Sequence, residues 1–262
     1  MSENRELIYN ELASALKEAE KTCIGIKPIS VTNPELAIRD AYSIQLLNIK
    51  KELAEGKTIT GKKIGLTSLA MQNMLNVNQP DFGHLLDSME VKNNIAARKK
   101  LVAPKVEAEI AFILKEAVKG PHATAEDVIA ATDYVVAAIE IVDSRVADWK
   151  INIIDTVADN ASSGLYVLSG KRVDPKKIDL KAVSMELFKN GEKINGGKGE
   201  DVLGDPAYSV AWLANTLYEY GVVLGKGEVV LSGALSAAPP VEAGDHIKAV
   251  FSDLGEIKVD FE

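Results

Sequence analysis

The segment that most restricts the fold is residues 134–142 (YVVAAIEIV), which is apolar at every position except Glu140. A run of this kind is typical of a strand that is covered on both faces, because a strand with one solvated face alternates apolar and polar residues. Such a strand needs other strands beside it and further chain above and below it. The segment therefore predicts a central strand in a sheet-based fold.

Other segments with strand-like composition follow from residue 106 onward. They are rich in β-branched and apolar residues and are separated by turn-forming residues. The predicted strands are 106–114, 134–142, 164–168, 183–188, 228–231, 247–251 and 257–261, and 59–65 is a further short, strand-like stretch nearer the N-terminus. Asn190 and Gly191 predict a tight hairpin. Helices are expected at 125–131 and at 208–220, the second one ending just before Gly221.

The first part of the chain has the apolar spacing of helices. Leu7, Leu12 and Leu16 predict one amphipathic helix. A second helix is predicted with Asn33 as its N-cap and Pro34 at its first position, ending near Gly56. One or two further helical turns are expected at 69–75. The pattern predicts an α+β protein with a helical N-terminal region, 1–57, and a strand-rich body, 58–262, built as one continuous unit.

Charge and composition exclude several classes of partner. The formal net charge is −8, and no run of Lys and Arg is long enough to follow a phosphate backbone, so nucleic acid is not expected as a partner. No apolar stretch is long enough to predict a membrane span. The single cysteine, Cys23, excludes an internal disulfide. We expect a cytoplasmic protein, in which a small anionic ligand would need a local cation to hold it.

Two acids with a spacing of two residues form the first candidate site. In the predicted strand 106–114, Glu107 and Glu109 point to the same face, because successive side chains of a strand alternate. Two neighbouring carboxylates repel each other, and burial increases that repulsion unless a bound cation relieves it. The alternative is an edge strand with two solvated acids, and the spacing alone does not decide between them.

Glu140 is a second anomaly, because it is the one charged residue of its apolar strand. A buried carboxylate needs a partner, since leaving it unpaired costs several kcal/mol. The partner is either a basic side chain in a structural ion pair or a metal ion shared with Glu107 and Glu109. Three carboxylates suit Mg²⁺ or Mn²⁺ better than zinc. On this reasoning, a Glu140 side chain that points away from the other two acids, or that forms a salt bridge with a basic side chain, would rule out the shared ion.

Lys63 lies near the end of a short predicted strand and is followed by glycine and hydroxyl residues (GKKIGLTS, 61–68). Such a lysine can carry an anion or take part in proton transfer, although a solvated lysine is the more common case. The triplet DFG at 81–83 matches the metal-binding triplet of kinases, but no glycine-rich phosphate loop or catalytic-loop pattern accompanies it. A kinase is therefore not expected.

Several of these segments, taken in order, resemble the hydratase/decarboxylase family of meta-cleavage pathways. The similarity extends over essentially the whole chain. It is carried by the segments IGLTS (64–68), NQPDFGHLL (78–86), PKVEAEI (104–110), IEIVDSR (139–145), DTVADNASSG (155–164), VAWLANTL (210–217) and LSGA (231–234), with Gly244 and Asp245. Each motif is weak alone, but their order is specific.

The resemblance implies a fold and an activity. The fold is the fumarylacetoacetate-hydrolase-like one, a roll of mixed β-sheets. The activity is the metal-dependent hydration of 2-hydroxypenta-2,4-dienoate to 4-hydroxy-2-oxopentanoate in the meta-cleavage catabolism of aromatic compounds. One alternative is decarboxylation of 2-oxo-3-hexenedioate, and another is a non-catalytic partner subunit of that decarboxylase. The resemblance also implies a homo-oligomer and a complex between hydratase and decarboxylase.

The resemblance also assigns roles to single residues. It implies that Glu107, Glu109 and Glu140 are ligands of the divalent metal, Mg²⁺ or Mn²⁺. It places Lys63 and Asp81 near the substrate as proton-transfer groups. Finally, it implies that Ser162 contacts the substrate and that Leu66 lies at the pocket wall.

Overall fold

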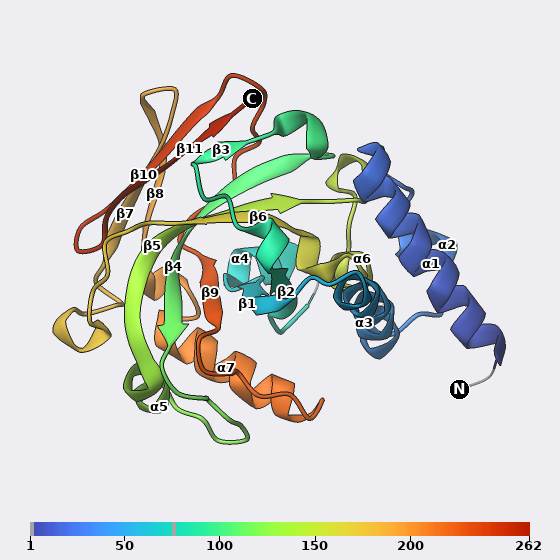
Figure 1. The fold of residues 1–262 in the computed structure, drawn as a ribbon, viewed down its shortest axis with the longest axis horizontal. Coiled ribbons are helices and arrows are strands. Elements are labelled where there is room, and N and C mark those ends of the chain that lie inside the picture. Colours follow the sequence, from blue (N-terminus) through green and yellow to red (C-terminus); the bar gives the residue numbers. More distant parts are fainter. Residues whose placement is uncertain (1–2, 75–76) are drawn as a thin grey trace.

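The computed structural model of the chain describes residues 3–74 and 77–262. Three helices come first, α1 (Glu3–Thr22), α2 (Ile29–Thr32) and α3 (Ile38–Ala54), and they lie together at one side of the molecule (Figure 1). Helix α3 ends two residues before Gly56, as the sequence indicates. The predicted N-cap of the second helix is wrong. Asn33 closes α2, where its N–H bonds to the Ile29 carbonyl, and α3 begins after Ala37.

The larger sheet has six strands in the order β2-β1-β9-β4-β5-β6. Its pairs are antiparallel except for β1 and β9, which run parallel. The strands are β1 (Ile59–Gly65), β2 (Asp81–Leu86), β4 (Pro104–Leu114), β5 (Thr132–Asp143), β6 (Ser163–Leu168) and β9 (Val229–Ala234). Residues 135–143 of β5 are all buried, which confirms the prediction of a central, covered strand.

The second sheet has five strands in the order β3-β11-β10-β7-β8. They are β3 (Ile95–Ala96), β7 (Ser184–Lys189), β8 (Glu192–Lys198), β10 (His246–Phe251) and β11 (Gly255–Phe261). The predicted hairpin joins β7 to β8. Asn190 and Gly191 at its tip both have positive φ, of 54° and 86°, as a two-residue hairpin of this hand requires.

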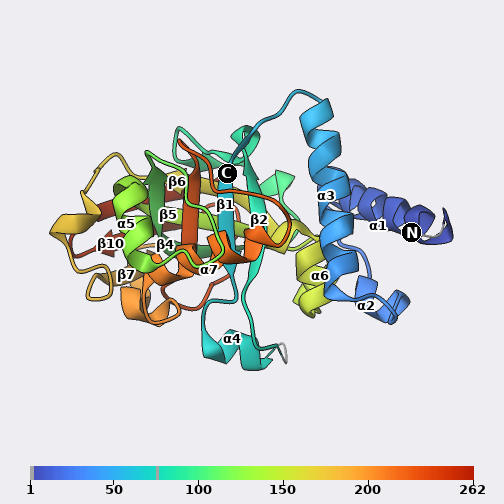
Figure 2. The ribbon, with the colours of Figure 1, turned by 90° about the horizontal axis from the view of Figure 1, so that it is seen from below.

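The remaining helices are α4 (Leu69–Met74), α5 (Ala125–Ala131), α6 (Ile153–Ala158) and α7 (Pro206–Tyr218). Helix α5 has the predicted bounds, whereas α7 begins two residues earlier than predicted, with Asp205 as its N-cap and Pro206 at its first position. The predicted helical turns at 69–75 correspond to α4, except for residue 75, which lies outside the described residues. Helix α4 projects away from the sheets (Figure 2).

One cluster of buried apolar side chains connects the N-terminal helices to both sheets. It contains Ala13 of α1, Ile44 of α3, Val106 of β4, Ile139 of β5 and Val259 of β11. Helix α3 packs on α6, which in turn contacts β2. This packing fixes the ends of β1 and β2 relative to the centre of the larger sheet. None of the helices within the described residues is long and apolar enough to cross a membrane.

Candidate metal centre

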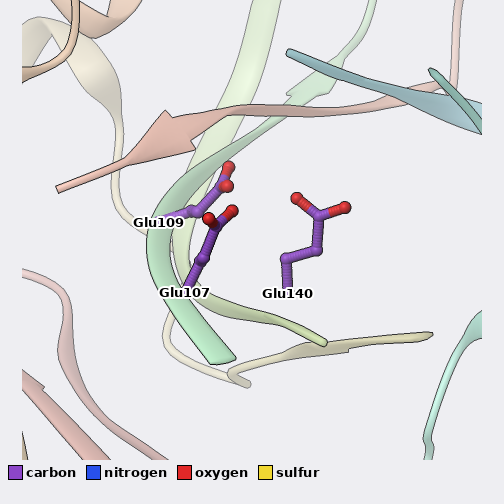
Figure 3. A group of neighbouring side chains, drawn as sticks. All are labelled: Glu107, Glu109 and Glu140. Carbon is purple, nitrogen blue, oxygen red and sulfur yellow. The ribbon is translucent and has the colours of Figure 1, made fainter. Parts of the chain in front are cut away.

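The pairing of β4 with β5 brings the three glutamates together. In this antiparallel pair Glu107 lies directly opposite Glu140, and Glu109 lies opposite Ala138. The three side chains project from the same face and their carboxylates converge (Figure 3). One carboxylate oxygen from each residue lies within 4.8 Å of the other two. Like charges placed directly across a strand pair are destabilising, so this arrangement needs a compensating cation.

The structure excludes the alternative of solvated acids on an edge strand. Strand β4 lies inside the sheet, between β9 and β5. Glu109 and Glu140 are both 0% exposed, and only Glu107 is partly exposed. Among the described residues, several carboxylate oxygens of this cluster have no hydrogen-bond partner, namely Oε1 of Glu109 and both oxygens of Glu140, although Oε1 of Glu140 lies within ion-pair distance of Lys63. Buried oxygens of this kind are costly unless a cation accompanies them.

The electrostatics of the cluster favour the protonated acids when no cation is bound. Burial raises the pKa of Glu140 to about 7. Burial, together with repulsion from Glu140 and Glu107, raises the pKa of Glu109 well above its usual range. Burial also raises the pKa of Glu107, against the opposing effect of the Lys63 ammonium. These shifts are the effects expected of like charges that share a site from which water is excluded.

Lys63 of β1 is a basic group that contacts the cluster directly. Its Nζ lies 3.3 Å from Oε1 of Glu140 and donates a hydrogen bond of 3.0 Å to the Ala161 carbonyl. Burial opposes its charge, but Glu140 and Glu107 raise its pKa, so the lysine stays protonated at neutral pH.

The ion pair between Lys63 and Glu140 is therefore present, which is one of the two observations expected to rule out a shared ion. That expectation was too strict, because a salt bridge to one acid leaves the other acids of the cluster without a counter-charge. The ion pair does not account for the whole cluster. One ammonium balances one carboxylate, whereas three acids converge and Oε1 of Glu109 stays without a partner. Glu140 also points toward Glu107 and Glu109, as a shared ion requires (Figure 3). The ion pair and the remaining negative charge coexist at this site.

Asp81 begins β2, next to Lys63 on β1. It is 1% exposed, and its Oδ2 accepts a hydrogen bond of 3.1 Å from the Thr156 hydroxyl, while Oδ1 has no hydrogen-bond partner in the part of the chain that the structure describes. Burial raises the pKa of Asp81, although Lys63 lowers it. Gly65 allows this close approach. A Cβ at Gly65 would lie 2.3 Å from Oδ1 of Asp81 and 3.4 Å from Nζ of Lys63.

Ser162 lies in a left-handed turn between α6 and β6. Asn160, Ala161 and Ser162 all have positive φ, of 56°, 51° and 51°. Non-glycine residues adopt this conformation only where the surrounding structure enforces it. The Asn160 side chain bonds both to the N–H and to the carbonyl of His84, which ties the turn to β2. The Ser162 hydroxyl donates to Asp159 at 3.3 Å.

Buried Arg145 holds the start of the same turn. Its guanidinium binds Oδ1 of Asp159 at 2.6 Å, the Asp159 carbonyl at 2.6 Å and the Ser163 carbonyl at 2.7 Å. Leu66, the remaining predicted site residue, follows β1 with a positive φ of 57°, and its carbonyl accepts a bond from Gln72. The roles predicted for Ser162 and Leu66 stay predictions, since their geometry alone does not assign a ligand.

Two positioning residues were not assigned a role from the sequence. Thr156 of α6 holds Asp81, and the Gly233 N–H donates a bond of 2.8 Å to Oε2 of Glu109. Gly233 has a φ of 116°, and a Cβ there would lie 2.4 Å from the Thr67 hydroxyl. A glycine within an apolar strand is a signal of close approach by another group. No comparable signal marks Thr156.

A separate cavity of about 200 Å³ lies between the N-terminal helices and the body. Its lining includes Gln45, Glu52, Arg145 and Asp159, and the three glutamates are not part of that lining. The cavity therefore borders the left-handed turn at Asp159 and Asn160, and it does not border the carboxylate cluster.

A family model described as the C-terminal part of fumarylacetoacetate (FAA) hydrolase matches residues 71–262. Among curated proteins, the chain is 46% identical over 249 residues to 2-hydroxyhexa-2,4-dienoate hydratase from Comamonas testosteroni, covering 94% of each chain. It is 41% identical over 253 residues to 2-keto-4-pentenoate hydratase from Paraburkholderia xenovorans, covering 96% of this chain and 94% of the relative.

Among solved structures, the chain is similar to 4-oxalocrotonate decarboxylase from Pseudomonas putida G7, complexed with magnesium and adipate. The TM-score is 0.95, the identity is 37% and the alignment covers 98% of both chains. This agreement confirms the predicted fold, with mixed sheets and a helical N-terminal region.

Proposed function

The chain belongs to the fumarylacetoacetate hydrolase family, and we propose that within it the chain is a divalent-metal-dependent hydratase of small 2-hydroxy-dienoic acids. It converts 2-hydroxypenta-2,4-dienoate into 4-hydroxy-2-oxopentanoate in the meta-cleavage catabolism of aromatic compounds. The hydratases that align with nearly the whole chain support this activity. The enzyme is a hydro-lyase whose substrate is a small organic acid.

The observation that carries the metal requirement is the set of buried carboxylate oxygens without partners. Glu107, Glu109 and Glu140 would hold the ion, since three hard oxygen donors within 4.8 Å of one another suit Mg²⁺ or Mn²⁺. The magnesium in the similar decarboxylase structure supports the same class of ion. When bound, the ion would act as a Lewis acid that stabilises negative charge on the 2-oxo group of the substrate.

Lys63 and Asp81 are the proposed proton-transfer groups. The overall reaction adds a proton at C5 and a hydroxyl group at C4, while the enol at C2 becomes a ketone and C3 gains the second hydrogen. Oδ1 of Asp81 has no hydrogen-bond partner, and burial raises the pKa of this acid. These properties suit a general base that takes the proton from the attacking water. The Lys63 ammonium supplies positive charge beside it, and Thr156 keeps Asp81 in place.

Ser162 and Leu66 complete the proposed substrate pocket. Ser162 is 2% exposed and lies next to Ala161, whose carbonyl holds the Lys63 ammonium. Leu66 follows Gly65, the glycine that borders both Lys63 and Asp81. Ala161 and Gly65, the chain neighbours of Ser162 and Leu66, thus both border the proposed proton-transfer groups. This position supports a contact between the Ser162 hydroxyl and the substrate. It also supports Leu66 as part of the apolar wall of the pocket.

The decisive experiment follows the loss of 2-hydroxypenta-2,4-dienoate by its ultraviolet absorbance. We expect turnover to stop with EDTA and to return with Mg²⁺ or Mn²⁺. Glu107→Gln should lose the metal-dependent turnover. If Glu107→Gln kept full activity that depends on the metal, the assignment of the ligands would be wrong.

Decarboxylation is the second candidate, because the similar decarboxylase structure has a TM-score of 0.95. The same preparation should therefore also be assayed with 2-oxo-3-hexenedioate, with release of CO₂ as the readout. We expect the hydratase reaction to be the faster one. A chain that acts only as a partner subunit would be inactive with both substrates when metal is supplied.

A further inference from the structure

Lys105 lies on the same face of β4 as Glu107 and Glu109, because side chains two residues apart in a strand point the same way. Exposure changes along this face. Glu109 is fully buried, whereas Glu107 and Lys105 are partly exposed. The carboxylate cluster therefore opens toward solvent at the end of β4 that carries Lys105. A ligand that enters from this end passes the lysine before it reaches the glutamates.

Trp149 holds the Lys105 side chain in place. Nζ of Lys105 lies 4.2 Å from the centroid of the Trp149 ring, which is the geometry of a cation–π contact. The indole is itself fixed, since its Nε1 donates a bond of 2.8 Å to the Ala103 carbonyl. Asp148 and Trp149 both have positive φ, of 59° and 53°. A backbone held in this region is strained, and such strain is concentrated at functional sites.

Lys105 forms no salt bridge among residues 3–74 and 77–262. The Glu107 carboxylate attracts its ammonium from beyond salt-bridge distance, so the N–H donors of Lys105 stay available to a ligand. Lys63, in contrast, is bound to Glu140 and to a carbonyl oxygen. With a divalent ion bound, the ion and Lys63 together carry three positive charges. The four ionised acids of the site carry four negative charges, so one negative charge is left over. These acids are Glu107, Glu109, Glu140 and Asp81. This net negative charge would repel an anionic substrate.

We propose that Lys105, held over Trp149, binds the carboxylate of the incoming substrate and sets the affinity of the site for anionic 2-oxo acids. This inference rests on the proposed function, because it takes the substrate to be a small carboxylic acid. Lys105 makes the direct contact, and Trp149 is a positioning residue that keeps the ammonium at the opening. The lysine thereby supplies the local cation that a chain of net charge −8 needs in order to hold an acid.

The test compares Lys105→Met with Lys105→Arg. Methionine keeps the apolar stem over the indole and removes the charge, whereas arginine keeps both the charge and the stacking. We expect Lys105→Met to raise KM for 2-hydroxypenta-2,4-dienoate about tenfold, with kcat changed by less than about twofold. Lys105→Arg should stay within about threefold of the wild-type KM. Trp149→Leu should raise KM with a smaller effect than the loss of the charge.

Lys248→Met is the matched control, because Lys248 also stacks on a ring, with Nζ 4.8 Å from the Phe188 centroid, but does so in the second sheet. It should leave KM unchanged. The KM of the wild type should rise with ionic strength more steeply than that of Lys105→Met. A KM for Lys105→Met within about twofold of wild type, or an equal increase in Lys248→Met, would overturn the proposal.

A binding measurement separates this inference from the proposed function. Calorimetric titration with 2-oxopentanoate, a saturated acid with the same carboxylate, in the presence of Mg²⁺ needs no turnover. Lys105→Met should weaken its Kd about tenfold. If wild-type protein fails to hydrate the dienoate but Lys105→Met still weakens 2-oxopentanoate binding, the proposed function fails and the role of Lys105 stands. If the dienoate is hydrated and the Kd is unchanged, the role of Lys105 fails alone.

Discussion

Glu109 is fully buried, and one of its two carboxylate oxygens bonds to Gly233 while the other has no partner. Glu109→Gln keeps the shape of the side chain and removes its charge. We expect the metal-dependent turnover to fall on the order of 100-fold or more, since an ion ligand is lost. The melting temperature in EDTA should not fall, because the neutral glutamine matches the protonated form of Glu109 that the metal-free cluster favours. Differential scanning fluorimetry and the hydratase assay check both outcomes.

The pKa of Glu140 predicts a dependence of stability on pH in the metal-free protein. Burial raises this pKa from 4.5 to about 7, so the folded state holds the proton more tightly than the unfolded chain does. The stabilising effect of that proton is complete below pH 4.5 and is lost as the pH rises through about 7. Relative to Glu140→Gln, the wild type should lose up to ~3 kcal/mol across this window.

Urea denaturation in EDTA at several pH values measures that difference. Glu140→Gln also removes the ion pair with Lys63, which changes the free energy of unfolding by a constant amount. This constant does not affect the result, because only the change of the free energy of unfolding with pH is compared. Glu192→Gln, at an exposed position of β8, is the control. A difference between wild type and Glu140→Gln that stays flat from pH 4.5 to 7 would contradict the raised pKa.

Gly65→Ala tests the contact between the ends of β1 and β2. The added Cβ would lie 2.3 Å from Oδ1 of Asp81, so the carboxylate must move. A displacement of about 1 Å is expected to lower kcat on the order of 100-fold. Gly170→Ala is the control, since no atom lies within 4 Å of its Cβ position. Equal kcat values for the two variants would show that the position of Asp81 is not critical.

At the scale of residues, the sequence predicted which acids lie together in the candidate site but not how they meet. The two-residue spacing put Glu107 and Glu109 on one face, because the alternation of a strand is a local property. The position of Glu140 opposite Glu107 depends on the register between β4 and β5, which no local pattern specifies. The contact of Lys63 with Glu140 depends on the order of strands in the sheet and could not be predicted either.

At the scale of elements, α3 supports the strand that carries Asp81. Nε2 of Gln45 donates to the carbonyls of Phe82 and Val157, at 3.1 and 2.9 Å, and its Oε1 contacts Nδ1 of His84. Gln45→Leu leaves these carbonyls unpaired. We expect a loss of about 2–3 kcal/mol in the free energy of unfolding, and a lower kcat through displacement of Asp81. Lys50→Ala, exposed on the same helix, is the control for urea denaturation and kinetics.

Elements with long regular patterns were predicted closely, whereas one strand with a mixed pattern was missed. Strands β4, β5, β10 and β11 differ from their predicted bounds by about two residues at most, since long apolar or alternating runs are hard to mistake. Strand β2 was missed, because Asp81 and His84 interrupt its apolar residues. Those polar residues lie in the candidate site or support it, so the residues proposed for function are the ones that weaken the strand signal.

At the scale of the whole molecule, the bound ion should stabilise the fold. A ligand that binds only the folded state adds ~2.7 kcal/mol at a concentration 100 times its Kd. Returning Mg²⁺ or Mn²⁺ to EDTA-treated protein should therefore raise the melting temperature by several degrees. The increase should be absent in Glu109→Gln. A protein with buried ion pairs but no ion site would melt at the same temperature with and without metal.

The matched family region begins at residue 71, whereas β1 ends at Gly65. All three glutamates lie inside that region, but Lys63 precedes it on the strand between β2 and β9. Chimaeras designed from the region that the family model matches would inherit the acids and lose their counter-charge, together with the strand that joins two parts of the sheet. The interchangeable unit for engineering new hydratases therefore has to begin upstream of Ile59, at a boundary set by the sheet rather than by the family model.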